Sequence, residues 1–422
     1  MNDASHARPR VSVLAGFSPA ATDAVARGLL ATDPDLVLLS HDLTAVRDGV
    51  VRRTIRTADT VLETGETHLV HGCVSCTLRE DVLPALVRLS RERPGIDIVL
   101  ALPPAIEPET VVAAYATAVV DSVAVADLVR LDSCVTVVEA DTFLDDLTST
   151  DDLRDRDLHA ADNDHRGVAD VVVRQVEFAD SIVVWSNPRI GAFETGRLEA
   201  LLHRLAPWAA HLRIGDTATV NCTALAAQIR RSGRHNPAVP GMLGRAMEGF
   251  PIGIHDPAGD HGVNAILFRS RRPFYPQRLH DALAELTGNA LRGRGQLWIA
   301  SQPAAAIGWE SAGGGILLGN LGCWLSALPR ERWVEATDMR RLAADLDWDP
   351  YYGDRSTALS FVGIGLDVTA LTRQLAGCLL TDAEIAAGTE AWRDLQDPFD
   401  GFFPLIDDRG PAAIATGAGP AG

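Results

Sequence analysis

Two cysteines that lie three residues apart, Cys73 and Cys76, are the residues of this sequence best suited to chemistry. A pair of thiols at this spacing can hold one zinc ion as thiolates, or it can close into a redox-active disulfide. His71 is near enough along the chain to be a third ligand. The sequence therefore predicts a zinc site at Cys73, Cys76 and His71. Further possible ligands flank this segment: His68, Glu80 and Asp81.

A thiol redox function is the alternative for the same pair. Cys76 directly precedes a helical pattern that runs from Leu78 to Arg91. A position at the start of a helix lowers the pKa of a thiol and makes it more reactive. The flanking residues, however, lack the Trp-Cys-Gly-Pro-Cys order of thioredoxin-like proteins.

A strand, a turn at Gly16 and a helix are predicted between residues 11 and 30. A P-loop, GxxxxGK[ST], holds nucleotide phosphates in this arrangement. Here Ala21, Thr22 and Asp23 stand at the positions of the second glycine, the lysine and the hydroxyl residue. A helix N-terminus alone attracts an anion by only about 1 kcal/mol, and a carboxylate at Asp23 opposes that attraction. We expect GTP to bind weakly, if at all, beside Gly16, Ala21, Thr22 and Asp23.

Short apolar runs alternate with helical patterns through the first half of the chain. The buried type of run occurs at residues 36–40, 96–102, 131–139 and 181–185, and residues 50–57 and 60–63 predict a more exposed strand pair. Strands separated by helices indicate an α/β fold with a mainly parallel sheet. We expect a P-loop NTPase-like sheet with helices on both faces.

Changes in composition indicate two domains. Residues 1–232 form the first, and residues 233–262, rich in glycine, proline and histidine, predict a linker. Residues 263–400 predict a smaller α+β domain with strands at 263–270, 296–300 and 356–364, and residues 401–422 a flexible tail.

Charge and cysteine usage exclude several classes of protein. A net charge of -18 disfavours direct binding to bare RNA, which needs clustered basic residues. The chain has no apolar run long enough to cross a membrane, and its first ten residues do not resemble a signal peptide. The other four cysteines are isolated, which argues against a secreted disulfide framework. We expect a cytoplasmic protein.

The thiol segment and the second domain resemble one family. Gly72 to Asp81 is similar to the Gly-Cys-x-Cys-Cys-Thr-Leu-Arg-Glu-Asp signature of CobW-type P-loop proteins, with Ser75 in place of the middle cysteine. Residues 271–279, 292–300, 309–313 and 352–355 resemble motifs of the CobW C-terminal domain. The resemblance implies a GTP-binding metal chaperone fold that ends in this domain.

The nucleotide motifs of that family are altered in this chain. Besides the turn at Gly16, the strand at 98–102 has no carboxylate, although the family places an acidic residue there. The guanine-reading Asn-Lys-x-Asp is replaced by Trp185-Ser186-Asn187-Pro188. Because three motifs differ together, we do not expect an efficient NTPase.

Three functions therefore remain open. Within the family, the Cys-x-x-Cys loop, the altered nucleotide motifs and the Ala312–Gly315 turn most resemble members that recruit a ribosome hibernation factor. That resemblance implies a zinc-responsive adaptor that brings the factor to ribosomes through protein contacts when zinc is scarce. The alternatives are a GTP-dependent zinc metallochaperone and a thiol redox protein.

Overall fold

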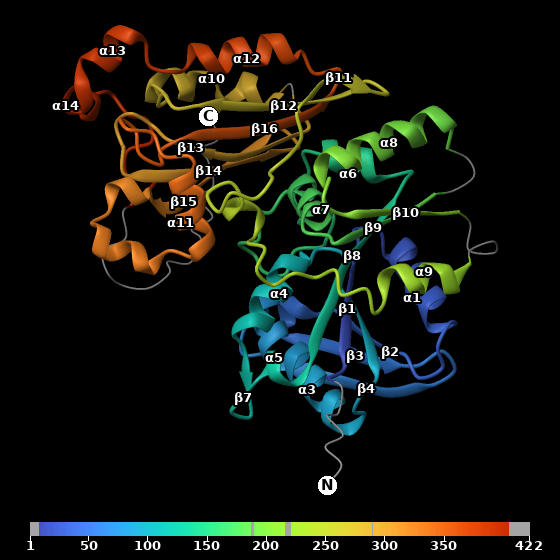
Figure 1. The fold of residues 1–422 in the computed structure, drawn as a ribbon. Coiled ribbons are helices and arrows are strands. Elements are labelled where there is room, and N and C mark those ends of the chain that lie inside the picture. The colour runs from blue at the N-terminus through green and yellow to red at the C-terminus, as the bar shows by residue number, and fades with distance from the viewer. Residues whose placement is uncertain (1–7, 187–189, 216–220, 289, 405–422) are drawn as a thin grey trace. The chain divides into compact units, whose positions relative to one another are not determined.

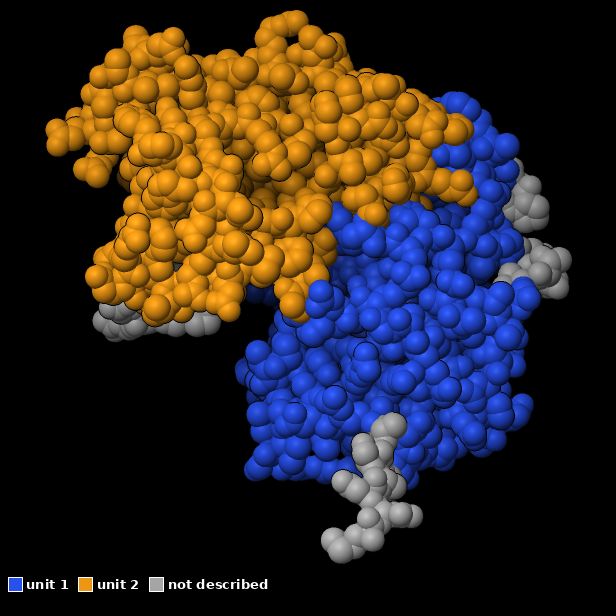
Figure 2. Space-filling view, viewed as in Figure 1, with its two compact units in different colours: residues 1–198, 208–237 blue, residues 199–207, 238–422 orange. Residues whose placement is uncertain are grey.

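The computed structural model describes residues 8–186, 190–215, 221–288 and 290–404. The chain divides into two compact units (Figure 2). The first contains residues 1–198 and 208–237, and the second contains residues 199–207 and 238–422. No helix of the described residues is both long and apolar enough to cross a membrane.

The first unit is built on an eight-stranded sheet with the order β10-β9-β8-β1-β5-β2-β3-β4 (Figure 1). The strands from β10 to β2 pair in parallel, whereas β3 and β4 add antiparallel at one edge. Its strands are β1 (Arg10–Ala15), β2 (Val37–Asp42), β3 (Val50–Arg56), β4 (Val61–His68), β5 (Asp97–Ala101), β8 (Arg130–Glu139), β9 (Ser181–Trp185) and β10 (Ala210–Ile214), and β6 (Val119–Val120) and β7 (Val123–Ala124) form a separate hairpin.

Helices cover both faces of this sheet, as the sequence predicted. They are α1 (Pro19–Leu30), α2 (Val74–Thr77), α3 (Leu83–Glu92), α4 (Pro108–Thr117), α5 (Val125–Leu128), α6 (Phe143–Thr148), α7 (Val168–Glu177), α8 (Ala192–Leu205) and α9 (Cys222–Ile229), with short turns η1 (Val46–Asp48) and η2 (Leu78–Val82). On one face, Leu86 of α3 and Val111 of α4 pack against Val13 and Leu100 of the sheet. On the other face, α1 and α9 pack against Leu14 and Val135. This double cover explains why the central strands are apolar at nearly every position.

The second unit contains a six-stranded antiparallel sheet with the order β11-β12-β16-β13-β14-β15. The strands are β11 (Asp256–Asp260), β12 (Val263–Ser270), β13 (Arg292–Leu297), β14 (Ala305–Ala312), β15 (Gly315–Cys323) and β16 (Thr357–Ile364). The helices and short turns are η3 (Met242–Gly244), α10 (Pro276–Gly288), η4 (Leu325–Ala327), η5 (Arg330–Glu335), α11 (Asp338–Leu346), α12 (Val368–Gly377), α13 (Asp382–Ala386) and α14 (Gly388–Arg393). Phe274, Leu279, Trp309 and Phe361 lie in its main core.

One predicted strand of this unit was placed wrongly. We expected residues 296–300, but the strand is β13, which begins at Arg292. Arg292 is fully buried and pairs with Glu310 of the neighbouring strand at 2.8 Å. Arginine is rarely buried unless it is paired. A strand that carries two buried arginines and two glycines therefore does not show an apolar pattern.

The segment at 233–262 is also more structured than a free linker. Residues 233–237 belong to the first unit and residues 238–262 to the second. Ile252 accepts a hydrogen bond from the buried Arg294 guanidinium, and Asp256 opens strand β11. The segment is therefore rich in glycine and proline and is still held in place, for example by the Arg294 side chain at Ile252.

Gly295 is required in β13. Its φ of +140° is unfavourable for other residues, and an added Cβ would lie 2.0 Å from the Ala358 carbonyl oxygen. We expect Gly295→Ala to lower the free energy of unfolding by about 2 kcal/mol or more. Gly319→Ala is the matched control, because an added Cβ there meets no atom within 4 Å. Chemical denaturation measures both, and equal effects would contradict this account of the strand.

Candidate metal centre

The thiol loop, residues 69–76, follows the edge strand β4. Because β4 runs in the same direction as β2, the loop leaves the sheet at the end where β2 and its parallel neighbours finish. Leu69 donates a backbone hydrogen bond to Gly49 at 2.7 Å. An added Cβ at Gly72 would lie 2.1 Å from the Val46 carbonyl oxygen. Only glycine allows this close approach, which fixes the middle of the loop against η1.

The two cysteines have different roles in the loop. Cys73 is the N-cap of α2, and its Sγ accepts a hydrogen bond from the Cys76 backbone N–H at 3.4 Å. Thr77 donates its hydroxyl to the Cys73 carbonyl at 3.0 Å. Cys76 lies deeper, 5% exposed, in a small apolar cluster with Val46. The short helix thus places two thiols on one side of the loop.

Histidine and thiol come together as the spacing predicted. The Nδ1 atom of His71 lies 3.8 Å from Cys76 Sγ. In a tetrahedral site with ordinary Zn–S and Zn–N bonds, a sulfur and a nitrogen ligand lie about 3.6 Å apart. His71 is exposed and Cys73 is half-buried, so an ion can reach the pair from solvent. The spacing of His71 and Cys76 fits two ligands of one zinc ion. Cys73 is not within 4.8 Å of both of these donor atoms, so it must move to join them on the ion.

The lowered pKa that the alternative redox function would need at Cys76 is not found. Burial, and then the neighbouring Cys73 thiol, raise the pKa of Cys76 above its usual value. The short α2 does not offset this desolvation. A thiol that stays protonated at neutral pH is a poor redox nucleophile, although a metal ion can still displace its proton.

Of the three further possible zinc ligands that flank the loop, only Glu80 lies against the thiols. Glu80 interacts with Cys76 while it accepts a hydrogen bond from the Val70 backbone N–H at 3.0 Å, so it can complete the site. The His68 side chain is 80% exposed and turns toward Glu66. Asp81 is engaged elsewhere, and its prediction as a possible ligand was wrong.

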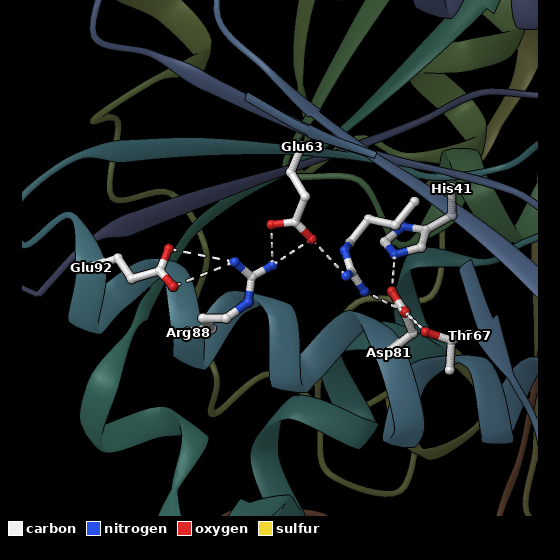
Figure 3. A network of polar contacts seen from close by, with 7 residues as sticks. His41, Glu63, Thr67, Asp81, Arg88 and Glu92 are labelled. Atoms are coloured by element: carbon white, nitrogen blue, oxygen red, sulfur yellow. Dashed lines mark hydrogen bonds and ion pairs between the residues drawn. The ribbon is translucent and has the colours of Figure 1, made fainter. Parts of the chain in front are cut away.

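Asp81 is the centre of a buried polar network (Figure 3). Its carboxylate accepts hydrogen bonds from His41 of β2 at 2.8 Å, from Arg53 of β3 and from Thr67 of β4. Arg53 continues the network to Glu63 at 2.7 Å. Burial alone would raise the pKa of Asp81, but the hydrogen bonds from His41, Thr67 and Arg53 hold it well below its usual value. The residue therefore remains a carboxylate that ties three strands to η2.

The turn at Gly16 forms a capped helix start instead of a phosphate loop. Helix α1 begins at Pro19, and Ser18 accepts a hydrogen bond from the Ala21 N–H at 3.3 Å. The Thr22 backbone N–H binds the Ser18 carbonyl at 3.0 Å, and the Thr22 hydroxyl binds the same oxygen at 2.8 Å. A P-loop needs such N–H groups to be free for phosphate. Asp23 pairs with Arg27 and faces solvent.

Space and charge near this turn also disfavour a nucleotide. The cavity beside Phe17 and Ser18 measures about 10 Å³, room for about one water molecule. Strand β5 ends at Ala101 without a carboxylate, and the Pro104 carbonyl accepts a hydrogen bond from Gln175 at 2.7 Å. Of the altered guanine motif, Asn187 and Pro188 lie outside the described residues.

A second group of possible metal ligands was missed in the sequence. The donor atoms of Cys134, Asp180 and His235 all lie within 4.8 Å of one another. They come from β8, from the residue before β9 and from the segment after α9. In the sequence Cys134 is one of the isolated cysteines, and no local spacing marks a site whose members are 46 and 55 residues apart.

Comparison with known proteins decides the family. Residues 50–210 match the CobW/HypB/UreG nucleotide-binding domain, and residues 263–379 match the cobalamin synthesis protein CobW C-terminal domain. A protein of Mycobacterium tuberculosis named a zinc chaperone is 35% identical over 363 residues, which cover 83% of this chain and 84% of that protein. The chain belongs to the CobW family.

Two proteins of lower sequence identity are also similar to this chain. The "zinc-regulated GTPase metalloprotein activator 1" of Dictyostelium discoideum is 28% identical over 78% of this chain and 69% of its own length. The solved structure of the Zn(II)-bound YjiA GTPase from E. coli matches 90% of this chain and 100% of its own at 12% identity, with a TM-score of 0.34. The match to the CobW nucleotide-binding domain begins at residue 50, so it does not include the turn at Gly16.

We expect Asp81→Asn to lower the free energy of unfolding by about 3 kcal/mol at pH 7, because it removes the buried carboxylate that Arg53, His41 and Thr67 contact and leaves Arg53 with Glu63 alone. Since the folded pKa of Asp81 is depressed, this stability is fully present above about pH 4, the unfolded pKa, and is lost as pH falls below it. The difference between wild type and variant should therefore shrink at pH 3 in urea titrations.

Glu92→Gln is the control for Asp81→Asn. Glu92 contacts Arg88 at the exposed outer end of the network, so its loss should cost less than about 1 kcal/mol. A penalty for Asp81→Asn as small as that of the control would show that the network does not hold η2 to the strands.

We expect GTP with magnesium to bind with a dissociation constant weaker than about 1 mM. The N–H groups at the start of α1 are already bonded to Ser18, and no lysine stands at Thr22. Isothermal titration calorimetry measures the affinity, with magnesium-free GTP as the control. A magnesium-dependent micromolar affinity would contradict this and would favour a GTP-dependent zinc metallochaperone.

Proposed function

We propose that this CobW-family protein is a zinc carrier of the cytoplasm that takes up one zinc ion at the thiol loop, without a GTP hydrolysis cycle. The 3.8 Å approach of His71 Nδ1 to Cys76 Sγ, beside Cys73, carries the proposal. Here zinc is cargo. The named functions of the mycobacterial and Dictyostelium relatives, a zinc chaperone and a zinc-regulated activator, support the same class of cargo.

The loop has the properties of a site for transfer. Cys73 and His71 are accessible, and Glu80 must leave Arg79 and the Val70 N–H to become a ligand. A site that requires such exchange binds zinc less tightly than four preassembled thiolates would. Because the pKa of Cys76 is raised, zinc must displace its proton, and uptake weakens as pH falls. These features favour reversible loading over permanent structural binding.

We further propose that zinc loading regulates a protein contact, through which the chain recruits a ribosome hibernation factor to ribosomes when zinc is scarce. The resemblance of the thiol loop and the altered nucleotide motifs to adaptor members of the family supports this partner. A net charge of -18 disfavours bare RNA as the target. Three arginines that follow β12 are paired with carboxylates: Arg271 with Asp347, Arg272 with Asp382 and Arg278 with Glu384.

Zinc binding at the loop is tested with Cys73→Ser and Cys76→Ser. Each variant removes one thiolate, so we expect the loop's zinc affinity to fall by more than about 100-fold, and bound zinc to drop by one ion per chain. Competition with a chromogenic chelator measures the affinity.

Cys323→Ser, which changes a half-buried cysteine at the end of β15, is the control and should leave the zinc affinity of the loop unchanged. Unchanged affinity in Cys76→Ser would refute the proposed loading site.

Recruitment is tested by pull-down from zinc-starved and zinc-replete cells, with ribosome co-sedimentation of the same samples. We expect the hibernation factor to be recovered with the wild-type chain in starved cells only. The Cys73→Ser/Cys76→Ser chain should recover it in both conditions, since it cannot respond to zinc. Equal recovery with wild type in both conditions, or none in either, would rule out a zinc-regulated adaptor.

A further inference from the structure

We propose that Cys134, Asp180 and His235 form a second zinc site, which pins the segment after α9 to strand β8. This site differs from the thiol loop in position and in kind. It lies beside β8 and β9, where Asp180 directly precedes β9, so it is at the starting end of the parallel strands. The thiol loop lies at the opposite end, beyond β4 at one edge of the sheet. The second site therefore does not depend on the proposed function.

The distances within the group are those of metal ligands. His235 Nδ1 lies 3.9 Å from Cys134 Sγ and 3.3 Å from an Asp180 carboxylate oxygen. Ordinary bonds to a tetrahedral zinc ion would place a nitrogen about 3.6 Å from a sulfur and about 3.4 Å from an oxygen. The nitrogen–oxygen distance is longer than most N–H···O hydrogen bonds, which are 2.7–3.2 Å. Little movement is needed to admit an ion among the three donors.

The charge of the group suits a buried divalent cation. Cys134 is completely buried, and the side chains of His235 and Asp180 are 7% and 19% exposed. When zinc binds, the Cys134 thiol gives up its proton to solvent, and the sulfur becomes a thiolate ligand. One thiolate, one carboxylate and a neutral imidazole then balance the two positive charges of the ion. A neutral site avoids most of the cost of burying a charge.

Hydrogen bonds hold the donors in place before any ion binds. The Asp180 oxygen accepts a hydrogen bond from the Cys134 backbone N–H at 2.7 Å. The backbone N–H of His235 donates a hydrogen bond to the backbone carbonyl of Asp132 at 3.0 Å. The Asp132 carboxylate accepts hydrogen bonds from the backbone N–H groups of Ser232 and Gly233. This clamp carries His235 onto β8. Because folding already orders these donors, little further conformational entropy is lost when an ion binds.

The imidazole orientation points to the same conclusion. His235 directs Nδ1 at both other donors, whereas its buried Nε2 has no partner among the described residues. Nothing described on the Nε2 side fixes the ring by a hydrogen bond. The ring also packs against Phe178, with the ring centroids 6.5 Å apart, and this contact together with those at Nδ1 directs Nδ1 toward the sulfur and the carboxylate.

The test uses the Cys73→Ser/Cys76→Ser chain, from which the thiol loop can contribute no thiolate. Metal analysis after purification with zinc should find about one ion per chain. Titration of the metal-free chain with Co²⁺, a spectroscopic substitute for zinc, should produce a thiolate-to-cobalt absorption band and tetrahedral d–d bands. Adding Cys134→Ala should abolish the ion and the bands, and adding His235→Gln should weaken binding while the thiol remains. Cys378→Ala, at another buried cysteine, should leave both unchanged.

Each outcome bears on the proposal, and circular dichroism confirms that each variant is folded. If Cys134→Ala does not fold, His235→Gln supplies the test, because it keeps the buried sulfur. Absence of zinc and of cobalt bands in the folded Cys73→Ser/Cys76→Ser chain would overturn the second site. Cobalt–thiolate bands that persist in Cys134→Ala would also overturn it. If the thiol loop proved unable to bind zinc, wild type would still retain one ion that depends on Cys134.

Discussion

The buried carboxylate of Asp81 is the interaction on which the position of the thiol loop depends. It joins β2, β3 and β4 through His41, Arg53 and Thr67, and it belongs to the η2 turn that directly continues α2. The loop between β4 and α2 is therefore held at both ends, by the edge strand and by η2. Gly72 allows the middle of the loop to lie against Val46. His71 and Cys76 are brought together on this fixed base, with Cys73 at the start of α2 beside them, while the histidine stays accessible.

At the turn after β1, where a P-loop protein binds nucleotide, the fold is kept although the phosphate-binding groups are not. The parallel strands and the helices on both faces are present, yet Ser18 accepts hydrogen bonds from N–H groups at the start of α1 that a phosphate would need. The fold is maintained by apolar packing on both faces of the sheet, which does not require the phosphate ligands. The sheet and its helices therefore do not depend on a bound nucleotide, and neither does the thiol loop beyond β4.

Local pattern was sufficient to predict the architecture and the thiol loop. The central strands of the first unit, the helix after the cysteines and the approach of His71 to Cys76 all follow from short-range spacing. The errors arose where a residue's environment is set by distant partners. Asp81 was considered a zinc ligand because its partners His41 and Arg53 are 40 and 28 residues away. The raised pKa of Cys76 follows from burial, and the Cys134 group is assembled only by the sheet.

The most direct test of the central claim is zinc X-ray absorption spectroscopy on the Cys134→Ala chain loaded with one equivalent of zinc. This variant leaves the thiol loop as the proposed site for the ion. We expect two sulfur neighbours at about 2.3 Å, with nitrogen or oxygen completing four ligands. A zinc spectrum with only nitrogen and oxygen neighbours in the folded protein would contradict it.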